Sequence, residues 1–337
     1  MKTQNNTDQF LDTLASYFKK EHKKVRNNIA LSAYAILRSE TVNTAEIARH
    51  MGEVNNLNFK SNDMRIYRLL KSKNFHVNDR LWRGHISLLF NLMKESGLKK
   101  GKEIVINVDF TSDRDDYLIL CASIVFQEES IPIYFSMRNY PKRSGMFDQK
   151  KMEEAFFKAL RHLLPDSYTY TIVADRGFGN NRIIKILENL KFNYVLRLQT
   201  NLLIEYQKKM MKAKHLPHRN MTISNAYVNA WSQKIRIVKH VEKEASWVLA
   251  VSLKLMNPVK KYTGRFSIEK MFKNTKSGGF DLEKLLINKY DRFKRMLFIS
   301  CLAYTLLMFT GFLINNRAHP IKKNYFLHLK LLTAFSD

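Results

Sequence analysis

Three acidic side chains stand where they could support phosphoryl transfer. Asp109 and Asp175 each end an apolar, strand-like run, and Glu269 lies in a later helical segment. In-line displacement at a phosphate builds negative charge, which two hard cations held by carboxylate oxygens stabilise, and Mg²⁺ prefers such oxygen ligands. Asp109, Asp175 and Glu269 are therefore candidate catalytic residues and candidate ligands of two metal ions. The structural alternatives are a strand cap for Asp109 and turn chemistry for Asp175.

Glu269 also belongs to a spaced quartet. Tyr262, Arg265, Glu269 and Lys276 follow the pattern Y-x2-R-x3-E-x6-K, which resembles the signature of the DDE transposases of bacterial insertion sequences, specifically insertion sequence family four. The segment 175–178 (DRGF) is similar to the second-aspartate motif of that family. The resemblance covers roughly residues 100–280 and implies an RNase H-like core and two Mg²⁺ or Mn²⁺ ions. The alternative interpretation is a helix with one Arg/Glu ion pair.

The cations of the quartet are candidate DNA contacts. If the segment is one helix, Arg265, Glu269 and Lys276 lie on a common stripe. Arg265 would then bind a backbone phosphate through its fork and Lys276 would act as a point charge. Tyr262 would donate its hydroxyl to a phosphate, or pack as a core aromatic. The pair Thr263-Gly264 leaves the helix start open.

The charge distribution predicts a nucleic-acid partner. Lys and Arg number 57 against 30 Asp and Glu, and the sequence pI is about 9.9, a balance that favours binding to a polyanion. Basic residues exceed acidic ones by 18 to 9 in residues 1–100, 14 to 13 in 101–200 and 25 to 8 in 201–337. Basic flanks would thus contact phosphates around a nearly neutral middle section that carries both aspartates.

Other patterns bear on location. Cys121 and Cys301 lie in apolar runs without metal-binding spacing, as buried thiols in a reducing cytoplasm do. The start of the chain is polar and lacks a signal-peptide pattern. Leu297–Leu313 is apolar but short for a membrane span, so we expect a buried core helix. We therefore expect a cytoplasmic, nucleoid-associated protein with no membrane partner.

The first 98 residues are predicted to form a helical DNA end-binding domain. Thr44–Met51 and Ser61–Ser72 form a helix pair with the layout of a helix-turn-helix, although the link over 52–60 is longer than usual. Arg65 and Arg68 on the second helix are candidate DNA-binding residues. An ordinary helical bundle with a solvated basic face is the alternative.

The remaining chain predicts an α/β fold. Strands over 103–110, 117–126 and 131–137 precede a helix, a strand, a helix and a strand, an order that an RNase H-like core would show. Both aspartates can then project to one edge of the sheet. We place the first part of the core at 99–200, a basic β-rich insertion implied by the resemblance at 201–261, and the second part, with the glutamate helix and C-terminal helices, at 262–337.

These features predict a DNA transposase. It would bind terminal inverted repeats on double-stranded DNA as a homodimer, and use two metal ions for cleavage and strand transfer into target DNA. The alternatives are an RNase H-like nuclease without strand transfer and a non-catalytic DNA-binding derivative. The resemblance also implies a DNA hairpin served by an aromatic residue. Trp231 and Trp247 lie in the right region, but no motif selects either of them.

Overall fold

Helices occupy the first third of the chain in the computed structural model, which describes residues 2–113, 117–139, 148–229, 231, 233–242, 246–277 and 280–316. The acidic residues Asp115 and Asp116, the glycines at 278–279 and the C-terminal residues 317–337 lie outside these ranges. The N-terminal helices are α1 (Lys2–Ser16), α2 (Lys23–Ser39), α3 (Thr44–Asn55), α4 (Phe59–Lys71) and α5 (Asp79–Glu95).

The link between α3 and α4 is shorter than expected. Helix α3 continues through Gly52 to Asn55, and α4 begins after Asn58, whose side chain caps the Ser61 amide. The predicted link over 52–60 was therefore wrong. Gly52 does not end the helix. A Cβ at this position would lie 3.0 Å from the Leu57 carbonyl oxygen, so the glycine lets the turn pass close over α3. The short link is what a helix-turn-helix requires.

The central sheet has the predicted βββαβαβ order. Its elements are β1 (Glu103–Asp113), β2 (Tyr117–Phe126), β3 (Glu129–Asn139), α6 (Gln149–Leu163), β4 (Thr169–Ala174), α7 (Asn181–Asn189) and β5 (Asn193–Arg197). Strands β1, β2 and β3 form an antiparallel meander, while β4 pairs parallel to β1 and β5 parallel to β4. The resulting spatial order β3-β2-β1-β4-β5 is that of an RNase H-like core.

The region after β5 is rich in strands, as expected. It contains β6 (Leu203–Tyr206), β7 (Lys209–Lys212), β8 (Met221–Ala226), β9 (Ile235–Val241) and β10 (Ser246–Val251). Strand β10 pairs antiparallel with β5, so β10, β9 and β8 extend the central sheet, whereas β6 and β7 form a separate hairpin. The insertion is thus joined to the catalytic core by backbone hydrogen bonds.

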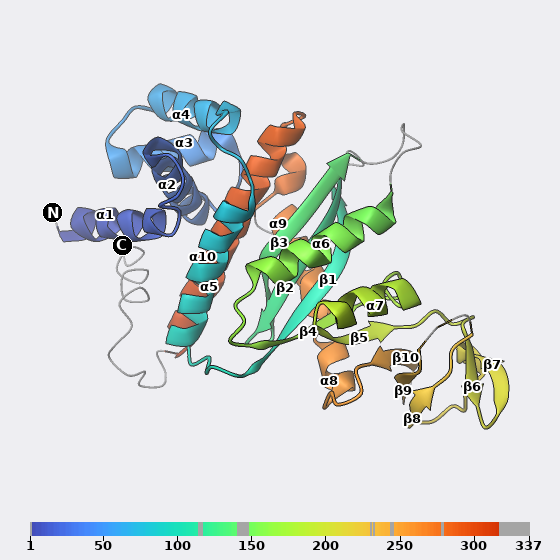
Figure 1. The fold of residues 1–337 in the computed structure, drawn as a ribbon. Helices are drawn as coiled ribbons and strands as arrows, with labels where there is room; N and C mark the ends of the chain where they lie inside the picture. Colours follow the sequence, from blue (N-terminus) through green and yellow to red (C-terminus); the bar gives the residue numbers. More distant parts are fainter. Residues whose placement is uncertain are drawn as a thin grey trace.

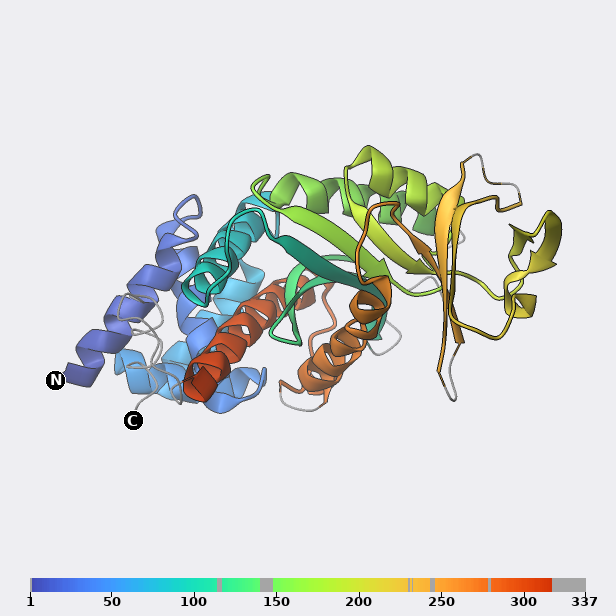
Figure 2. The ribbon, with the colours of Figure 1, turned by 90° about the horizontal axis from the view of Figure 1, so that it is seen from below.

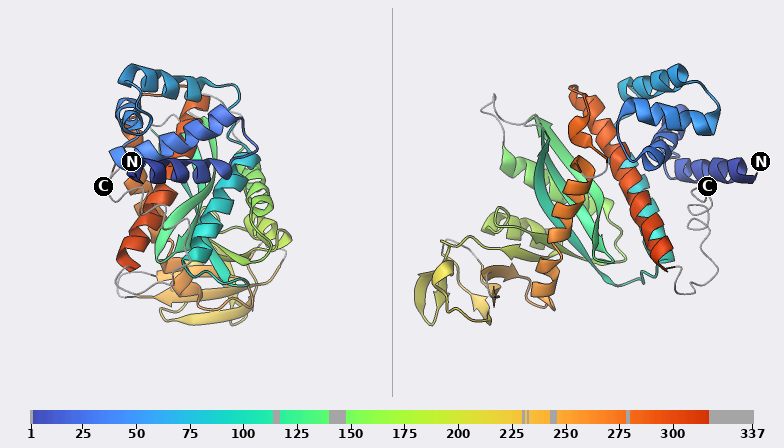
Figure 3. Two further views of the ribbon diagram at one scale, coloured as in Figure 1. Left: turned by 90° about the vertical axis from the view of Figure 1, so that its left-hand side faces the viewer. Right: turned by 180° about the vertical axis from the view of Figure 1, so that it is seen from behind.

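Helices cover both faces of the sheet. Figures 1 and 2 show α6 and α7 on one face, and α9 (Phe266–Lys276) and α10 (Tyr290–Asn316) on the other. Helix α8 (Pro258–Thr263) returns the chain from the insertion to the core. The N-terminal helices and the insertion lie at opposite ends of the molecule (Figure 3). The basic N-terminal domain and the basic insertion therefore lie at the two ends of the molecule, and the rest of the second basic flank packs on the core as α9 and α10.

Helix α10 is a core element that packs on the sheet and against the N-terminal helices. It is long and apolar enough to cross a membrane by length and composition, but 72% of its apolar window is buried inside the protein. This burial confirms the predicted core helix. Arg295 on α10 donates hydrogen bonds to the carbonyl oxygens of Phe75 and Leu70 at 2.6 Å. The end of α4 is therefore tied directly to the core.

His85 is a buried histidine between α5, β3 and α10. It is fully buried, its Nε2 lies 2.9 Å from the Pro132 carbonyl oxygen, and its Nδ1 has no hydrogen-bond partner among the described residues. Burial lowers the pKa of His85 from 6.5 to about 4. The ring is therefore neutral in the folded protein at pH 6, where an unfolded chain would bind a proton.

This pKa difference predicts an acid-dependent loss of stability. Between pH 6.5 and 4 the unfolded chain binds the extra proton, so the free energy of unfolding should fall by about 3 kcal/mol as the pH drops through this window. His85→Gln keeps a donor for Pro132 and cannot titrate. Urea unfolding at several pH values should show a smaller slope for the variant. Equal slopes for the two proteins would contradict the prediction.

Candidate active site

The two aspartates lie side by side on adjacent parallel strands, Asp109 within β1, which is longer than the sequence predicted, and Asp175 directly after the end of β4. Val108 on β1 pairs with Ala174 on β4, so the next residues, Asp109 and Asp175, follow at the same register. Neighbouring strands are about 4.8 Å apart. The sequence prediction that both acids reach one sheet edge is borne out by this pairing.

A tight loop after Asp175 sets its direction. Phe178 is buried and stacks on Phe110 with ring centroids 5.5 Å apart, which anchors the loop to β1. A Cβ on Gly179 would lie 2.0 Å from the Arg197 carbonyl oxygen, so only glycine allows this close approach. The Asn180 side chain then caps α7. The DRGF segment is therefore a turn fixed by packing, with Asp175 at its start.

The quartet lies on two helices. Helix α8 ends at Thr263, Gly264 and Arg265 form a turn, and α9 begins at Phe266. Arg265 is thus the N-cap of the helix that carries Glu269 and Lys276, and the start left open at Thr263-Gly264 is a break between two helices. The physical reason is a long-range contact: the side-chain amide of Asn107, on β1, donates to the Gly264 carbonyl oxygen at 3.1 Å. The turn accepts a hydrogen bond from the Nδ2 of this buried amide, whose Oδ1 has no partner among the described residues, and Arg265 follows at the start of α9.

Arg265 joins two of the three acids. Its Nη1 donates to Asp109 Oδ2 at 3.0 Å and its Nη2 donates to Glu269 Oε1 at 2.8 Å. The Arg265 side chain is only 5% exposed, against 24% for Asp109 and 54% for Glu269. A buried guanidinium needs charged partners to offset its lost hydration. Arg265 therefore fixes β1 and α9 relative to each other.

The acids influence one another electrostatically. Burial raises the pKa of Asp109, and Asp175 and Glu269 add to the rise, while Arg265 and the Phe110 amide oppose it. Burial alone would lower the pKa of Arg265, but Tyr262 and the three acids outweigh it and raise that pKa. The guanidinium thus stays charged, and Asp109 is an acid whose ionisation is unfavourable without nearby positive charge.

Tyr262 contacts the second aspartate. Its hydroxyl donates to Asp175 Oδ1 at 3.2 Å, and the Arg197 guanidinium, from the end of β5, lies 3.8 Å from the same oxygen. Tyr262 is fully buried and its ring centroid is 5.2 Å from that of Trp247. Tyr262 therefore packs as the core aromatic considered from the sequence, and its hydroxyl bonds to Asp175, while its contact with a phosphate stays a prediction.

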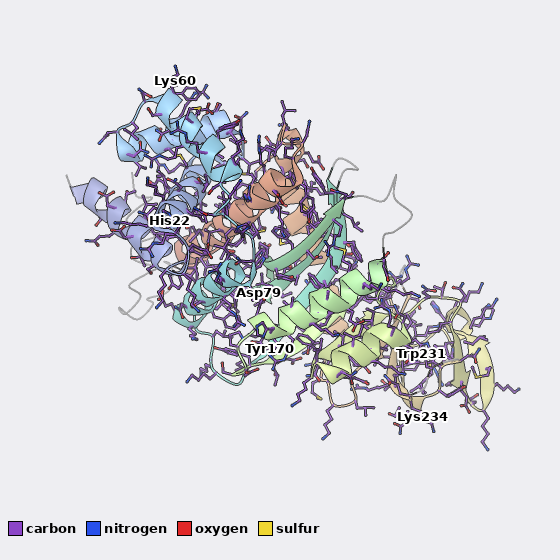
Figure 4. The ribbon with its side chains drawn as sticks, turned by 45° about the horizontal axis from the view of Figure 1, so that its top comes forward. His22, Lys60, Asp79, Tyr170, Trp231 and Lys234 are labelled. Atoms are coloured by element: carbon purple, nitrogen blue, oxygen red, sulfur yellow. The ribbon has the colours of Figure 1, made fainter. Side chains whose placement is uncertain are left out.

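The other predicted site residues lie farther away. Lys276 is at the far end of α9, about 10 Å along the helix from Glu269, where it lines a small apolar cavity with Thr111 and Cys121. Arg65 and Arg68 lie on α4 in the N-terminal region, away from the acids. Trp231 packs in the main core and Trp247 beside Tyr262, and both are largely buried. Figure 4 labels Trp231 in the insertion, at the opposite end from Lys60 on α4.

The donor set has the chemistry of a site for hard cations. Three carboxylates with electrostatic coupling are the oxygen ligands that Mg²⁺ and Mn²⁺ prefer. Within the described ranges, however, no three Asp, Glu, His or Cys side chains converge closely enough to hold an ion. Arg265 stands between Asp109 and Glu269 instead. The three carboxylates are thus suitable ligands for Mg²⁺ or Mn²⁺ by their chemistry, but the Arg265 guanidinium lies between Asp109 and Glu269.

Two functional candidates were missed from the sequence. Asn107 stands two residues before Asp109 on the same face of β1, and Arg197 ends β5 beside Asp175. A buried amide in an apolar run was a signal for Asn107, since such a group needs partners. Arg197 carried no signal in the sequence, because its approach to Asp175 follows from the pairing of β4 with β5.

Comparison with known proteins agrees with this site. Residues 146–306 match the family model described as "Transposase DDE domain", a segment that contains Asp175 and the whole quartet and begins after Asp109. No curated protein matches the chain.

Solved structures give weaker similarities. The catalytic domain of human endonuclease V is 14% identical, over 57% of this chain and 95% of that chain, with a TM-score of 0.31. Endonuclease V of Ciona intestinalis was solved in complex with a 24mer DNA containing an inosine. It is 12% identical over 55% of this chain and 95% of that chain, with a TM-score of 0.30. Such TM-scores carry no argument about this chain. The match of residues 146–306 to a transposase domain indicates that the chain is a DNA-cleaving enzyme.

Proposed function

We propose that this protein is a cut-and-paste DNA transposase of the group with the Tyr-Arg-Glu-Lys signature, insertion sequence family four. The observation that carries the proposal is the meeting of Asp109 and Asp175 with three residues of the quartet, in which Arg265 bonds to Asp109 and Glu269 and Tyr262 bonds to Asp175. The match of residues 146–306 to a transposase domain supports it. The substrates are then the terminal inverted repeats of an element and its target DNA.

The three carboxylates are the proposed ligands of two Mg²⁺ or Mn²⁺ ions. When bound, such ions stabilise the charge that develops on the scissile phosphate and activate the attacking water or 3′-hydroxyl. Asp109 and Asp175 present their carboxylates from adjacent strands, which fixes their separation. Glu269 is more exposed and comes from a helix, so it faces the side from which DNA would approach.

The other residues of the site would position the DNA backbone. Arg265 carries a planar guanidinium that matches a phosphate in a bidentate contact. Tyr262 holds Asp175 by a hydrogen bond, and Arg197 supplies a second positive charge beside that acid. Lys276 would contact a phosphate farther along the DNA, since it lies at the other end of α9.

A basic groove in the N-terminal domain is the proposed contact for the element ends. The groove lies between α2 and α4 and has a volume of about 980 Å³. Among the described residues its lining includes amide and basic side chains and no acid. The amide and basic side chains are those of Lys23, Lys24, Asn27, Asn28, Asn58, Lys60, Arg65 and Arg68.

Arg65 is already oriented in this groove, with its Nη1 3.4 Å from Asn28 Oδ1. The helix pair has the short link of a helix-turn-helix, so α4 is the proposed reading helix. Pairing two element ends implies a homodimer in the DNA complex, and the cytoplasm near the nucleoid is the proposed location.

Loss of each carboxylate tests the catalytic assignment. Asp109→Asn, Asp175→Asn and Glu269→Gln should each lower end cleavage by more than about 100-fold, because a metal ligand is lost. Affinity for end DNA should change only a few fold, since Lys and Arg contacts are kept. The surface variant Asp166→Asn is the matched control and should cleave normally.

Gel assays of strand cleavage and joining should be run with Mg²⁺ and with Mn²⁺. Full cleavage by any of the three site variants would refute the role of that residue. Cleavage without joined products by the wild-type protein would identify a nuclease instead of a transposase. DNA binding without cleavage in either metal would identify a non-catalytic derivative.

The N-terminal groove gives a separate prediction. Arg65→Ala and Arg68→Ala should weaken binding to end DNA more than to random DNA, because both lie on the proposed reading helix. Lys24→Ala should weaken both equally and reduce the slope of log K against log salt by about one phosphate contact. Equal losses on both DNAs for the arginine variants would make them backbone contacts. Unchanged affinity would contradict the proposal that α3 and α4 bind DNA as a helix-turn-helix.

A further inference from the structure

A buried amide stands under the turn between α8 and α9. Asn107 is fully buried, and alternation along β1 puts it on the same face as Asp109. Its Nδ2 lies 3.1 Å from the Gly264 carbonyl oxygen, 3.5 Å from the Arg265 carbonyl oxygen and 3.3 Å from Ser267 Oγ. All three acceptors belong to the turn that precedes Glu269. The strand that carries Asp109 therefore holds the start of α9 directly.

Two serine hydroxyls complete the contact. Ser130 Oγ, on β3, lies 3.2 Å from Asn107 Nδ2 and 2.6 Å from Ser267 Oγ. Ser267 Oγ donates to the Gly264 carbonyl oxygen at 2.7 Å. We call Asn107, Ser130 and Ser267 the amide–serine cluster. Because buried polar networks lose much of their benefit when one member is removed, this cluster should fix the turn strongly.

The turn determines where the Arg265 guanidinium goes. Arg265 is the residue directly after the held glycine, and its side chain runs back to Asp109 and forward to Glu269. Its Nε is buried and has no hydrogen-bond partner among the described residues. The guanidinium therefore lacks one of its hydrogen bonds in this position. A metal ion bound by both Asp109 and Glu269 would be repelled by its positive charge.

We propose that Asn107 is a positioning residue that holds Arg265 between Asp109 and Glu269 as the resident cation of the acids, until a DNA phosphate draws the guanidinium away. The inference rests on the proposed function for the role of DNA. A phosphate offers Arg265 a bidentate partner. By linkage, DNA binding and metal binding then strengthen each other by the same factor.

Metal affinity of the DNA-free protein tests the proposal without catalysis. Mn²⁺ binding is measured by electron paramagnetic resonance of free Mn²⁺ for wild type, Arg265→Ala, Asn107→Ala and the double variant. Arg265→Ala should bind Mn²⁺ at least about tenfold more tightly, because the competing cation is gone. Asn107→Ala should bind about three- to tenfold more tightly in the wild-type background and show no change in the Arg265→Ala background.

Controls separate positioning from general destabilisation. Thr171→Val removes a buried hydroxyl from the neighbouring strand β4, which bonds Glu103 away from the acids, and should leave Mn²⁺ affinity unchanged. Ser267→Ala should act like Asn107→Ala with a smaller effect, and serves if Asn107→Ala does not fold. Thermal melts confirm that each variant is folded at the assay temperature.

The Mn²⁺-binding results test the role of Asn107, whereas DNA cleavage tests the proposed function, so the two can fail separately. Weaker Mn²⁺ binding by Asn107→Ala in both backgrounds would overturn the proposal, because Asn107 would then be holding Glu269 and not Arg265. Additive effects of the two substitutions would also overturn it. If wild type cleaves no DNA but the Mn²⁺ results are as expected, the positioning role stands and the transposase function fails.

Discussion

The buried guanidinium of Arg265 is the constraint on which the site depends. Arg265 is 4% exposed as a whole residue, and a charge buried to this degree is stable only beside groups of opposite charge. Its partners are Asp109 on β1, 156 residues away in the sequence, and Glu269 on α9, 4 residues away. The pairing therefore brings Asp109 and Glu269 to one place, while parallel pairing of β1 and β4 brings Asp175 beside them. Two independent forces, charge pairing and strand register, assemble the same three acids.

Other contacts connect the site to the N-terminal helices and to the insertion. The amide–serine cluster fixes the turn before α9, and α10 packs over the sheet next to α9. Arg295 on α10 then ties the end of α4 to the core, and the Val42 amide bonds to the Phe280 carbonyl oxygen at 2.9 Å. At the other end, β10 extends the sheet from β5. The N-terminal domain and the insertion are thereby held in a fixed position relative to the acids.

Several of these features could be predicted from the sequence because their signals are local. An acid at the end of an apolar run marked Asp109 and Asp175, since an unpaired acid there is costly. The apolar run Leu297–Leu313 predicted a core helix, and the first three strands of the sheet followed from three strand-like runs.

The features that could not be predicted depend on contacts between distant residues. The break at Gly264 depends on Asn107, which is 157 residues away. The true length of α3 depends on the Leu57 carbonyl passing over Gly52. The approach of Arg197 to Asp175 and the pairing of β10 with β5 depend on strand register, which no single segment encodes.

We propose that Asp109, Asp175 and Glu269 form one metal-dependent phosphoryl-transfer site. The most direct measurement is anomalous scattering from Mn²⁺ in crystals of the protein bound to pre-cleaved end DNA. The account predicts Mn²⁺ peaks within coordination distance of all three carboxylates, at the scissile phosphate, with the Arg265 guanidinium moved from Asp109 to the DNA backbone. Mn²⁺ bound to the DNA at another place, with Arg265 still joining Asp109 and Glu269, would contradict it.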